Sequence, residues 1–199
     1  TPVAALHIAV AATGVGPGDE VITSPVTDFG TVTGILFQQA VPVFADLGAS
    51  TYNLEPAAVE RAITPRTKAI IAVHLAGTPC DLDALRAIAD RHRLVLIEDC
   101  AQAAGASQSG VPAGAWGDAA TFSFYPTKNL SCLGDGGAIS FKSKTHAEYA
   151  SQLAQYGWTS RYVIDHEGGF NSRLDEIQAA VLLERIDDLQ KNNDKRRQI

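Results

Sequence analysis

Short apolar runs alternate with segments of helical periodicity along the chain. Two of these runs, Ala69 to Val73 and Leu94 to Ile97, are unbroken in apolar character. A strand that is apolar at every position is covered on both faces, as in a parallel sheet between two layers of helices. The alternation therefore predicts an α/β fold with a mostly parallel central sheet and helices on both faces. We expect Ala69 to Val73 to be a central strand.

The same pattern places the remaining elements. Further strands are expected at Glu20 to Thr23, Pro42 to Ala45, Ala119 to Phe124 and Ala138 to Phe141, and helices at the opening segment, near Pro56 to Ile63 and after Asp81, which can cap its helix. A Gly-rich loop is expected at Tyr125 to Gly137. A last helix is expected to open at Ser172, with Asp175 three residues on as in a capping box. Its predicted buried face comprises Leu174, Ile177, Val181 and Leu189.

Composition and charge narrow the class of protein. The 199 residues are 46% hydrophobic and 19% charged, which suits one compact domain. The net charge is −6, and the basic residues are scattered until the closing stretch KNNDKRRQI, so we expect no nucleic-acid partner. The apolar runs are too short to span a bilayer, and no signal-peptide pattern opens the chain. Three cysteines without a CxxC pair are interpreted as unpaired thiols, and the cytoplasm as the compartment.

The two ends of the sequence suggest a piece of a longer chain. There is no methionine, and the first residues already have a helical pattern with no capping residue before them. The last helix continues into a charged segment without a stop signal. We therefore interpret residues 1–199 as one domain of a longer protein.

Polar side chains follow several of the predicted strands. Ligands in open α/β sheets lie beyond the carboxyl ends of the strands. Asp99 ends a buried strand, and the segment SFYPTKN carries Ser123 and Lys128 on one short connection. A hydroxyl, an amine and a carboxylate are thus expected to converge on one ligand. Glu98 should point away from them and be structural, and His74, after another strand, is interpreted as hydrogen-bonded scaffolding.

These segments resemble those of a known family. IEDCAQAAGA, GDAATFSFYPTKNL and GDGGAISF are similar to segments of the DegT/DnrJ/EryC1/StrS family of aminotransferases, and so are AALHIAVAATGVGPGDEVI, PVFADL, ITPRTKAIIAVHLAG and FNSRLDEIQAAVL. The segments follow the family's order along essentially the whole chain. The resemblance implies a fold-type-I large domain that binds pyridoxal 5'-phosphate, no metal, and a C-terminal small domain that this sequence lacks.

The resemblance also assigns roles to residues. Lys128 would hold the cofactor as a Schiff base and move the proton, and Asp99 would pair with the pyridine nitrogen. Gln102 would pack beside the ring, and Ser123 would bind the phosphate. Asn171 would reach the phosphate of a neighbouring subunit, so the resemblance implies a homodimer with a shared active site. The implied reaction transfers an amino group, with glutamate as the expected donor, to a nucleotide-linked keto sugar.

Two departures from the family pattern leave questions open. Pro2 and Val3 stand where the family has a Gly-Thr or Ser-Thr that holds the phosphate. In TDFGT, either Asp28 or Phe29 matches the family's stacking aromatic residue, and Phe29 is preferred because only it can stack. The alternatives to an aminotransferase are a sugar dehydratase, which Lys128 disfavours, and a non-catalytic regulatory homologue.

Overall fold

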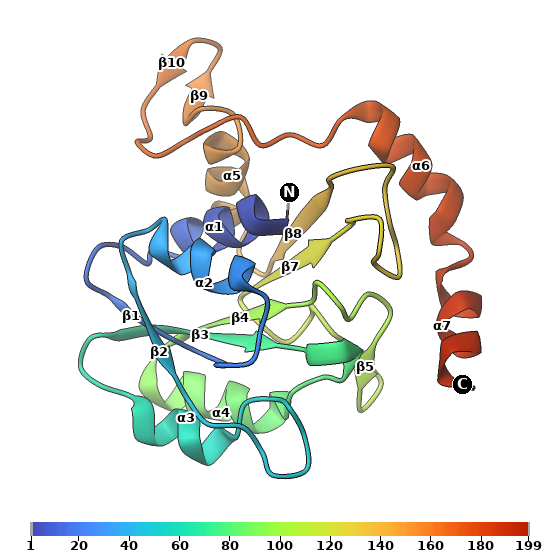
Figure 1. Ribbon diagram of the computed structural model, residues 1–199. Coiled ribbons are helices and arrows are strands. Elements are labelled where there is room, and N and C mark those ends of the chain that lie inside the picture. Colours follow the sequence, from blue (N-terminus) through green and yellow to red (C-terminus); the bar gives the residue numbers. More distant parts are fainter. Residues whose placement is uncertain (1, 199) are drawn as a thin grey trace.

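A six-stranded sheet forms the centre of the computed structural model, which describes residues 2–198 (Figure 1). Its order is β2-β1-β3-β4-β7-β8, with parallel pairing throughout except for the antiparallel pair β7 and β8. The strands are β1 (Glu20–Thr23), β2 (Val41–Phe44), β3 (Thr67–Val73), β4 (Val95–Asp99), β7 (Ala119–Ser123) and β8 (Gly137–Phe141). The α/β class and the mostly parallel sheet are confirmed, and β3 is a central strand as predicted.

Helices cover both faces of this sheet (Figure 1). The helices α1 (Pro2–Ala12) and α2 (Phe29–Leu36) lie on one face, and α3 (Pro56–Ala62) and α4 (Leu82–His92) lie on the other. Successive strand residues supply the two cores, because side chains alternate between the faces of a sheet. Ile70 packs into the core beneath α3 and α4, while Ile71 packs into the core beneath α1. Asp81 caps α4 as predicted, since its carboxylate accepts a 3.1 Å hydrogen bond from Ala84 N.

The rest of the chain surrounds this sandwich. It comprises the 3-10 turn η1 (Leu75–Gly77), the helix α5 (Lys144–Leu153), the hairpin of β5 (Ser107–Gln108) with β6 (Val111–Pro112), and the hairpin of β9 (Trp158–Ser160) with β10 (Val163–Ile164). All three cysteines are buried and unpaired, as expected. Within residues 2–198, no helix has both the length and the apolar character to cross a membrane.

The last predicted helix requires a correction. It is two helices, α6 (Glu176–Ile186) and α7 (Leu189–Arg197), and it begins four residues later than Ser172. Asp175 is the N-cap residue by position, but its side chain makes no capping hydrogen bond. The predicted buried face is only partly correct, because Ile177 is 75% exposed whereas Val181 and Leu189 are half-buried. Leu182, which was not predicted, is the buried residue of α6. The helix lies along the edge of the domain instead of over the sheet (Figure 1), so periodicity alone could not identify the face that packs.

Candidate functional site

The carboxyl ends of β3, β4 and β7 meet at one edge of the sheet, as parallel pairing requires. The register pairs Val73 with Asp99 and Asp99 with Thr121. His74 and Asp99 are therefore brought side by side at this edge, and the loop after β7 carries Lys128 toward them. Local sequence determines each strand, whereas the parallel register determines that their last residues are neighbours.

Asp99 is buried at this edge. Its carboxylate accepts hydrogen bonds from Thr31 Oγ1 at 2.8 Å and from Ala101 N at 3.1 Å. Burial raises the pKa of Asp99 above its ordinary value, and the two hydrogen bonds and the positive charge of Lys128 only partly oppose this shift. A buried carboxylate of this kind is stabilised in its ionised form when a cation contacts it.

A small cavity joins three of the predicted site residues. Asp99, Gln102 and Lys128 all line it, together with Asp28 and His74. Gln102 is held by its side-chain oxygen, which accepts a 2.6 Å hydrogen bond from Ala76 N. The cavity measures about 30 Å³, which is space for roughly two waters. These residues can therefore form one wall of a ligand site, but the cavity is too small to enclose a ligand.

Lys128 enters this cavity as a half-buried amine. Its backbone N donates a 2.8 Å hydrogen bond to Tyr125 O, which closes a tight turn after β7. Its Nζ has no hydrogen bond or ion pair with any other residue of the described range 2–198. An amine without a fixed partner, near a buried carboxylate, is available to react with a carbonyl group of a ligand.

The structure does not bring Phe29, Ser123 and Asn171 to this cavity. Phe29 is the first residue of α2 and is 69% exposed, because Asp28 caps the helix with a 2.8 Å hydrogen bond from Gly30 N. Asp28, the alternative that was not preferred, lines the cavity instead. Ser123 is buried at the end of β7 with its hydroxyl 3.4 Å from Tyr125 N. Asn171 is exposed and forms a bridge with Gln155.

Two site residues were not identified from the sequence. Thr31 donates to Asp99, and Thr27 lines the cavity and lies 2.8 Å from Thr31, hydroxyl to hydroxyl. Both belong to the segment TDFGT, in which Asp28 is a typical helix-capping residue. A helix start at Phe29 would have placed Thr31 in the first turn, facing the strand ends. The capping pattern was thus the available signal.

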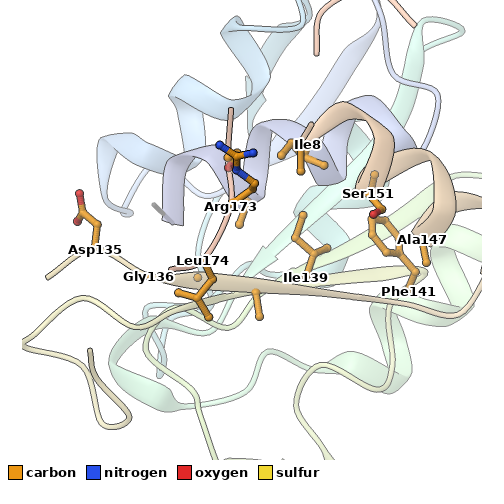
Figure 2. A pocket seen from close by; sticks show the side chains of 15 residues that line it. Ile8, Asp135, Gly136, Ile139, Phe141, Ala147, Ser151, Arg173 and Leu174 are labelled. Atoms are coloured by element: carbon orange, nitrogen blue, oxygen red, sulfur yellow. The ribbon is translucent and has the colours of Figure 1, made fainter. Parts of the chain in front are cut away.

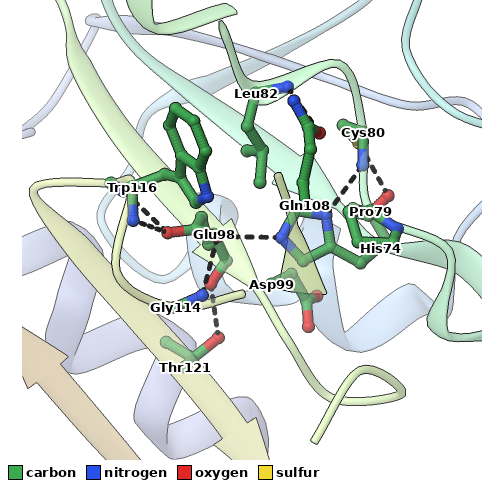
Figure 3. Close-up of polar contacts among 12 residues, drawn as sticks. His74, Pro79, Cys80, Leu82, Glu98, Asp99, Gln108, Gly114, Trp116 and Thr121 are labelled. Carbon is green, nitrogen blue, oxygen red and sulfur yellow. Dashed lines mark hydrogen bonds and ion pairs between the residues drawn. The ribbon is translucent and has the colours of Figure 1, made fainter. Parts of the chain in front are cut away.

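Behind the cavity lies a buried hydrogen-bond network (Figure 3). The Glu98 carboxylate accepts hydrogen bonds from the backbone N of Gly114, Trp116 and Gly117 at 2.7 to 2.8 Å, and His74 Nε2 lies 3.0 Å from it. His74 Nδ1 accepts from Cys80 N at 3.2 Å, which leaves Nε2 as the nitrogen that donates to Glu98. Burial acts to raise the pKa of Glu98, but these hydrogen bonds outweigh it and lower the pKa. The geometry agrees with the structural roles expected for Glu98 and His74.

A larger cavity lies elsewhere (Figure 2). It measures about 280 Å³ between α1, β8 and α5, and Ile8, Ile139 and Phe141 form its apolar wall, with Asp135 and Arg173 among its other lining residues. None of the predicted cofactor residues lines it. The larger cavity is therefore separate from the residues that the sequence predicted for the cofactor.

Comparison with known proteins adds to this geometry. A family model described as the DegT/DnrJ/EryC1/StrS aminotransferase family matches residues 2–199. A "Pleiotropic regulatory protein" of Geobacillus stearothermophilus is 49% identical over 97% of this chain and 52% of its own length. A "dTDP-3-amino-3,4,6-trideoxy-alpha-D-glucose transaminase" of Streptomyces venezuelae is 47% identical over 96% of this chain and 50% of its own. The chain thus spans about half the length of these relatives.

Solved structures give the same result. The S. venezuelae protein DesV, solved "in complex with ketimine intermediate", superposes with a TM-score of 0.93 at 45% identity, over 96% of this chain and 51% of its own. The Bacillus subtilis protein ntda, solved "with bound cofactor pmp", gives a TM-score of 0.89 at 35% identity, over 94% and 43%. These findings confirm the predicted fold type and the predicted pyridoxal phosphate class of cofactor.

Proposed function

The chain belongs to the DegT/DnrJ/EryC1/StrS aminotransferase family, and from this premise we propose that it forms the cofactor-binding domain of a sugar aminotransferase. The proposed reaction moves an amino group from glutamate to a nucleotide-linked keto sugar. The observation that carries the proposal is the convergence of Asp99, Gln102 and Lys128 on one cavity. The transaminase named above, 47% identical to this chain, supports a nucleotide-linked sugar as the substrate class.

The residues present suit pyridoxal phosphate. Asp99 is a carboxylate whose pKa is raised by burial, and a protonated pyridine nitrogen in contact with it would stabilise its ionised form. Lys128 offers an amine without a fixed partner for covalent attachment. Gln102, at the same cavity, would contact the ring. The donor set therefore fits the group.

When bound, pyridoxal phosphate supplies an electron-accepting ring. Asp99 would keep the ring nitrogen protonated, and its low-dielectric surroundings strengthen that charge pairing. Lys128 Nζ, once released from the cofactor, would take the proton from the carbon of the amino donor and return it at a second position. Thr31 would orient the Asp99 carboxylate through its 2.8 Å hydrogen bond.

Other segments would complete the site. The base cavity of about 30 Å³ cannot enclose a cofactor. Helix α6 carries apolar side chains that nothing in the described range covers, since Ile177 is 75% and Leu183 is 72% exposed. A helix that is apolar on several sides is normally buried. We propose that the protein is a cytoplasmic homodimer in which a second copy, together with the remainder of a longer chain, covers α6. In this dimer, Ser123 and Asn171 of the second copy would bind the cofactor phosphate. The stacking of Phe29 on the cofactor ring stays a prediction, and the exposure of its side chain does not favour it.

A regulatory role is the second candidate. The 49% identical relative bears the name "Pleiotropic regulatory protein", and that name alone supports this alternative. A free Lys128 beside a buried Asp99 favours catalysis, and Lys128 also disfavours the dehydratase alternative, which uses no covalent lysine.

Absorption spectroscopy of the full-length protein with pyridoxal phosphate tests the proposal. We expect a protein-bound cofactor band that borohydride fixes covalently to Lys128, that Lys128→Ala lacks, and that glutamate converts to the band of the amine form. A folded dimer that binds no cofactor would support the regulatory role. A cofactor-loaded protein that glutamate leaves unchanged would exclude glutamate as the donor.

A further inference from the structure

A polar cavity lies next to the cavity of Asp99 and Lys128. It measures about 260 Å³, is open to solvent, and is lined by η1, the loops after β4 and β7, and helix α7. Its polar lining consists of Gln102, Asn129, Asn193, Arg196 and Arg197. Gln102 lines both cavities, and Asn129 directly follows Lys128 in the chain. The two cavities are therefore neighbours that share Gln102 as a lining residue.

Buried polar contacts hold α7 against this cavity. Asn193 is only 6% exposed, and its Nδ2 donates a 2.9 Å hydrogen bond to Ala104 O. Its Oδ1 accepts a 2.8 Å hydrogen bond from Asn129 Nδ2. Gly105, at φ +81°, lies so close that an added Cβ would be 2.6 Å from Asn193 Nδ2. These contacts fix α7 against the loop after β4, so the shape of the cavity is set by buried contacts of the fold.

The charge at this cavity opposes that of the whole chain. The sequence has a net charge of −6, yet none of the described residues that line the cavity is acidic and two are arginines. Arg197 contacts Asp194 at 2.7 Å on its own helix. The guanidinium group of Arg196 makes no hydrogen bond or ion pair with the other residues of the range 2–198, although its backbone carbonyl accepts a hydrogen bond from Gln198 N. A guanidinium group without a carboxylate partner is suited to bind two oxygens of one phosphate group.

We propose that this cavity is the subsite for the diphosphate of the nucleotide-linked substrate, with Arg196 and Arg197 as its anion-binding residues. The inference rests on the proposed function, because it places the anionic part of that substrate beside Lys128. Asn129 would add an amide at the junction of the two cavities. Phosphate groups are also steered toward a local positive potential, so binding should weaken as salt increases.

Calorimetric titration of the cofactor-loaded, full-length protein with UDP and with dTDP tests this subsite. The variant Arg196→Gln/Arg197→Gln should bind whichever nucleotide the wild type binds with a dissociation constant higher by about 10-fold or more. Its affinity should also depend less on NaCl concentration. Thermal unfolding and the cofactor absorption band verify that the variant is folded and loaded.

Lys195→Gln is the matched control, because it removes the same charge from the same helix at a residue that does not line the cavity. We expect it to bind the nucleotide as the wild type does. Binding that is unchanged in the double variant, lowered equally by Lys195→Gln, or absent for both nucleotides in the wild type would overturn the subsite. Conversion of the wild-type cofactor by glutamate is measured separately, so a failure of the proposed function is recorded independently of nucleotide binding.

Discussion

Thr31 Oγ1 donates a 2.8 Å hydrogen bond to Asp99 Oδ2 and so joins the first turn of α2 to the end of β4. Both residues are buried, and 67 residues of chain separate them. The hydrogen bond lowers the pKa of Asp99, against the larger effect of burial, which raises it. Helix α2 therefore participates in the electrostatics of the site as well as in packing.

Replacing Thr31 with Val should destabilise the fold. The variant keeps the shape of the side chain but leaves an oxygen of the buried Asp99 without its donor. Loss of a hydrogen bond to a charged group costs about 1.5 to 3 kcal/mol, which urea denaturation can measure as a drop in the free energy of unfolding. Thr31→Ser keeps the hydroxyl and should lose less. Equal stability of Thr31→Val and the wild type would show that this hydrogen bond contributes nothing.

Asp99 should make the cofactor-free protein less stable as pH rises. Its pKa is raised in the folded state, so the folded protein binds the proton more tightly than the unfolded chain does. This contribution is present at low pH and is lost as pH rises through the folded-state pKa. Asp99→Asn should remove that loss and be more stable than the wild type near neutral pH. Thermal unfolding from about pH 5 to about pH 8 measures the difference, and parallel pH profiles would contradict the assignment.

Glu98→Gln should be strongly destabilising. Its carboxylate accepts from three backbone N–H groups and from His74, and an amide can satisfy only part of this set. Each buried donor that is left without an acceptor costs about 1 to 3 kcal/mol, and more where the lost acceptor is charged. The pKa of Glu98 is lowered, so its contribution is present above the ordinary value of 4.5 and is lost as pH falls through the folded-state pKa.

The control for Glu98 is Glu60→Gln. Glu60 pairs with Arg91 at the surface, where both side chains are exposed. Solvent and salt screen such exposed pairs, so urea denaturation should show little change in the free energy of unfolding for this variant. Similar losses for the two variants would mean that the buried network has no special weight.

Gly34→Ala should loosen the contact between α1 and α2. An added Cβ would lie 2.9 Å from Leu6 Cβ and 3.2 Å from His7 N, and the backbone atom cannot move freely. Overpacking costs about 1 to 3 kcal/mol, which exceeds the gain of about 1 kcal/mol from the better helix former. Gly16→Ala, where nothing lies within 4 Å, should be neutral or slightly stabilising. Thermal unfolding of the two variants measures this difference in stability. A Gly34→Ala protein as stable as Gly16→Ala would exclude close packing between α1 and α2 at Gly34.

Apolar continuity and end signals allowed much of the fold to be predicted. The strand Glu20–Thr23 was expected with its observed bounds, and Asp81 was expected as a cap. The prediction of buried side chains was wrong where burial depends on tertiary contacts. Helix α6 has an apolar pattern, but most of its apolar side chains are exposed. Phe29 shows the same dependence. Its position in the sequence matches the stacking aromatic residue of the family, but its direction is set by the helix that Asp28 caps.

The sequence by itself determined the alternation of strands and helices and the family, and it predicted Asp99, Gln102 and Lys128 as site residues, because these depend on local pattern and on ordered motifs. Only the tertiary structure decided that Thr31 donates a hydrogen bond to Asp99, that Asp28 lines the cavity while Phe29 does not, and that Arg196 and Gln102 line one cavity. Such pairings join segments far apart in the chain. They depend on strand register and on the packing of helices against the sheet, and local pattern does not encode either of these.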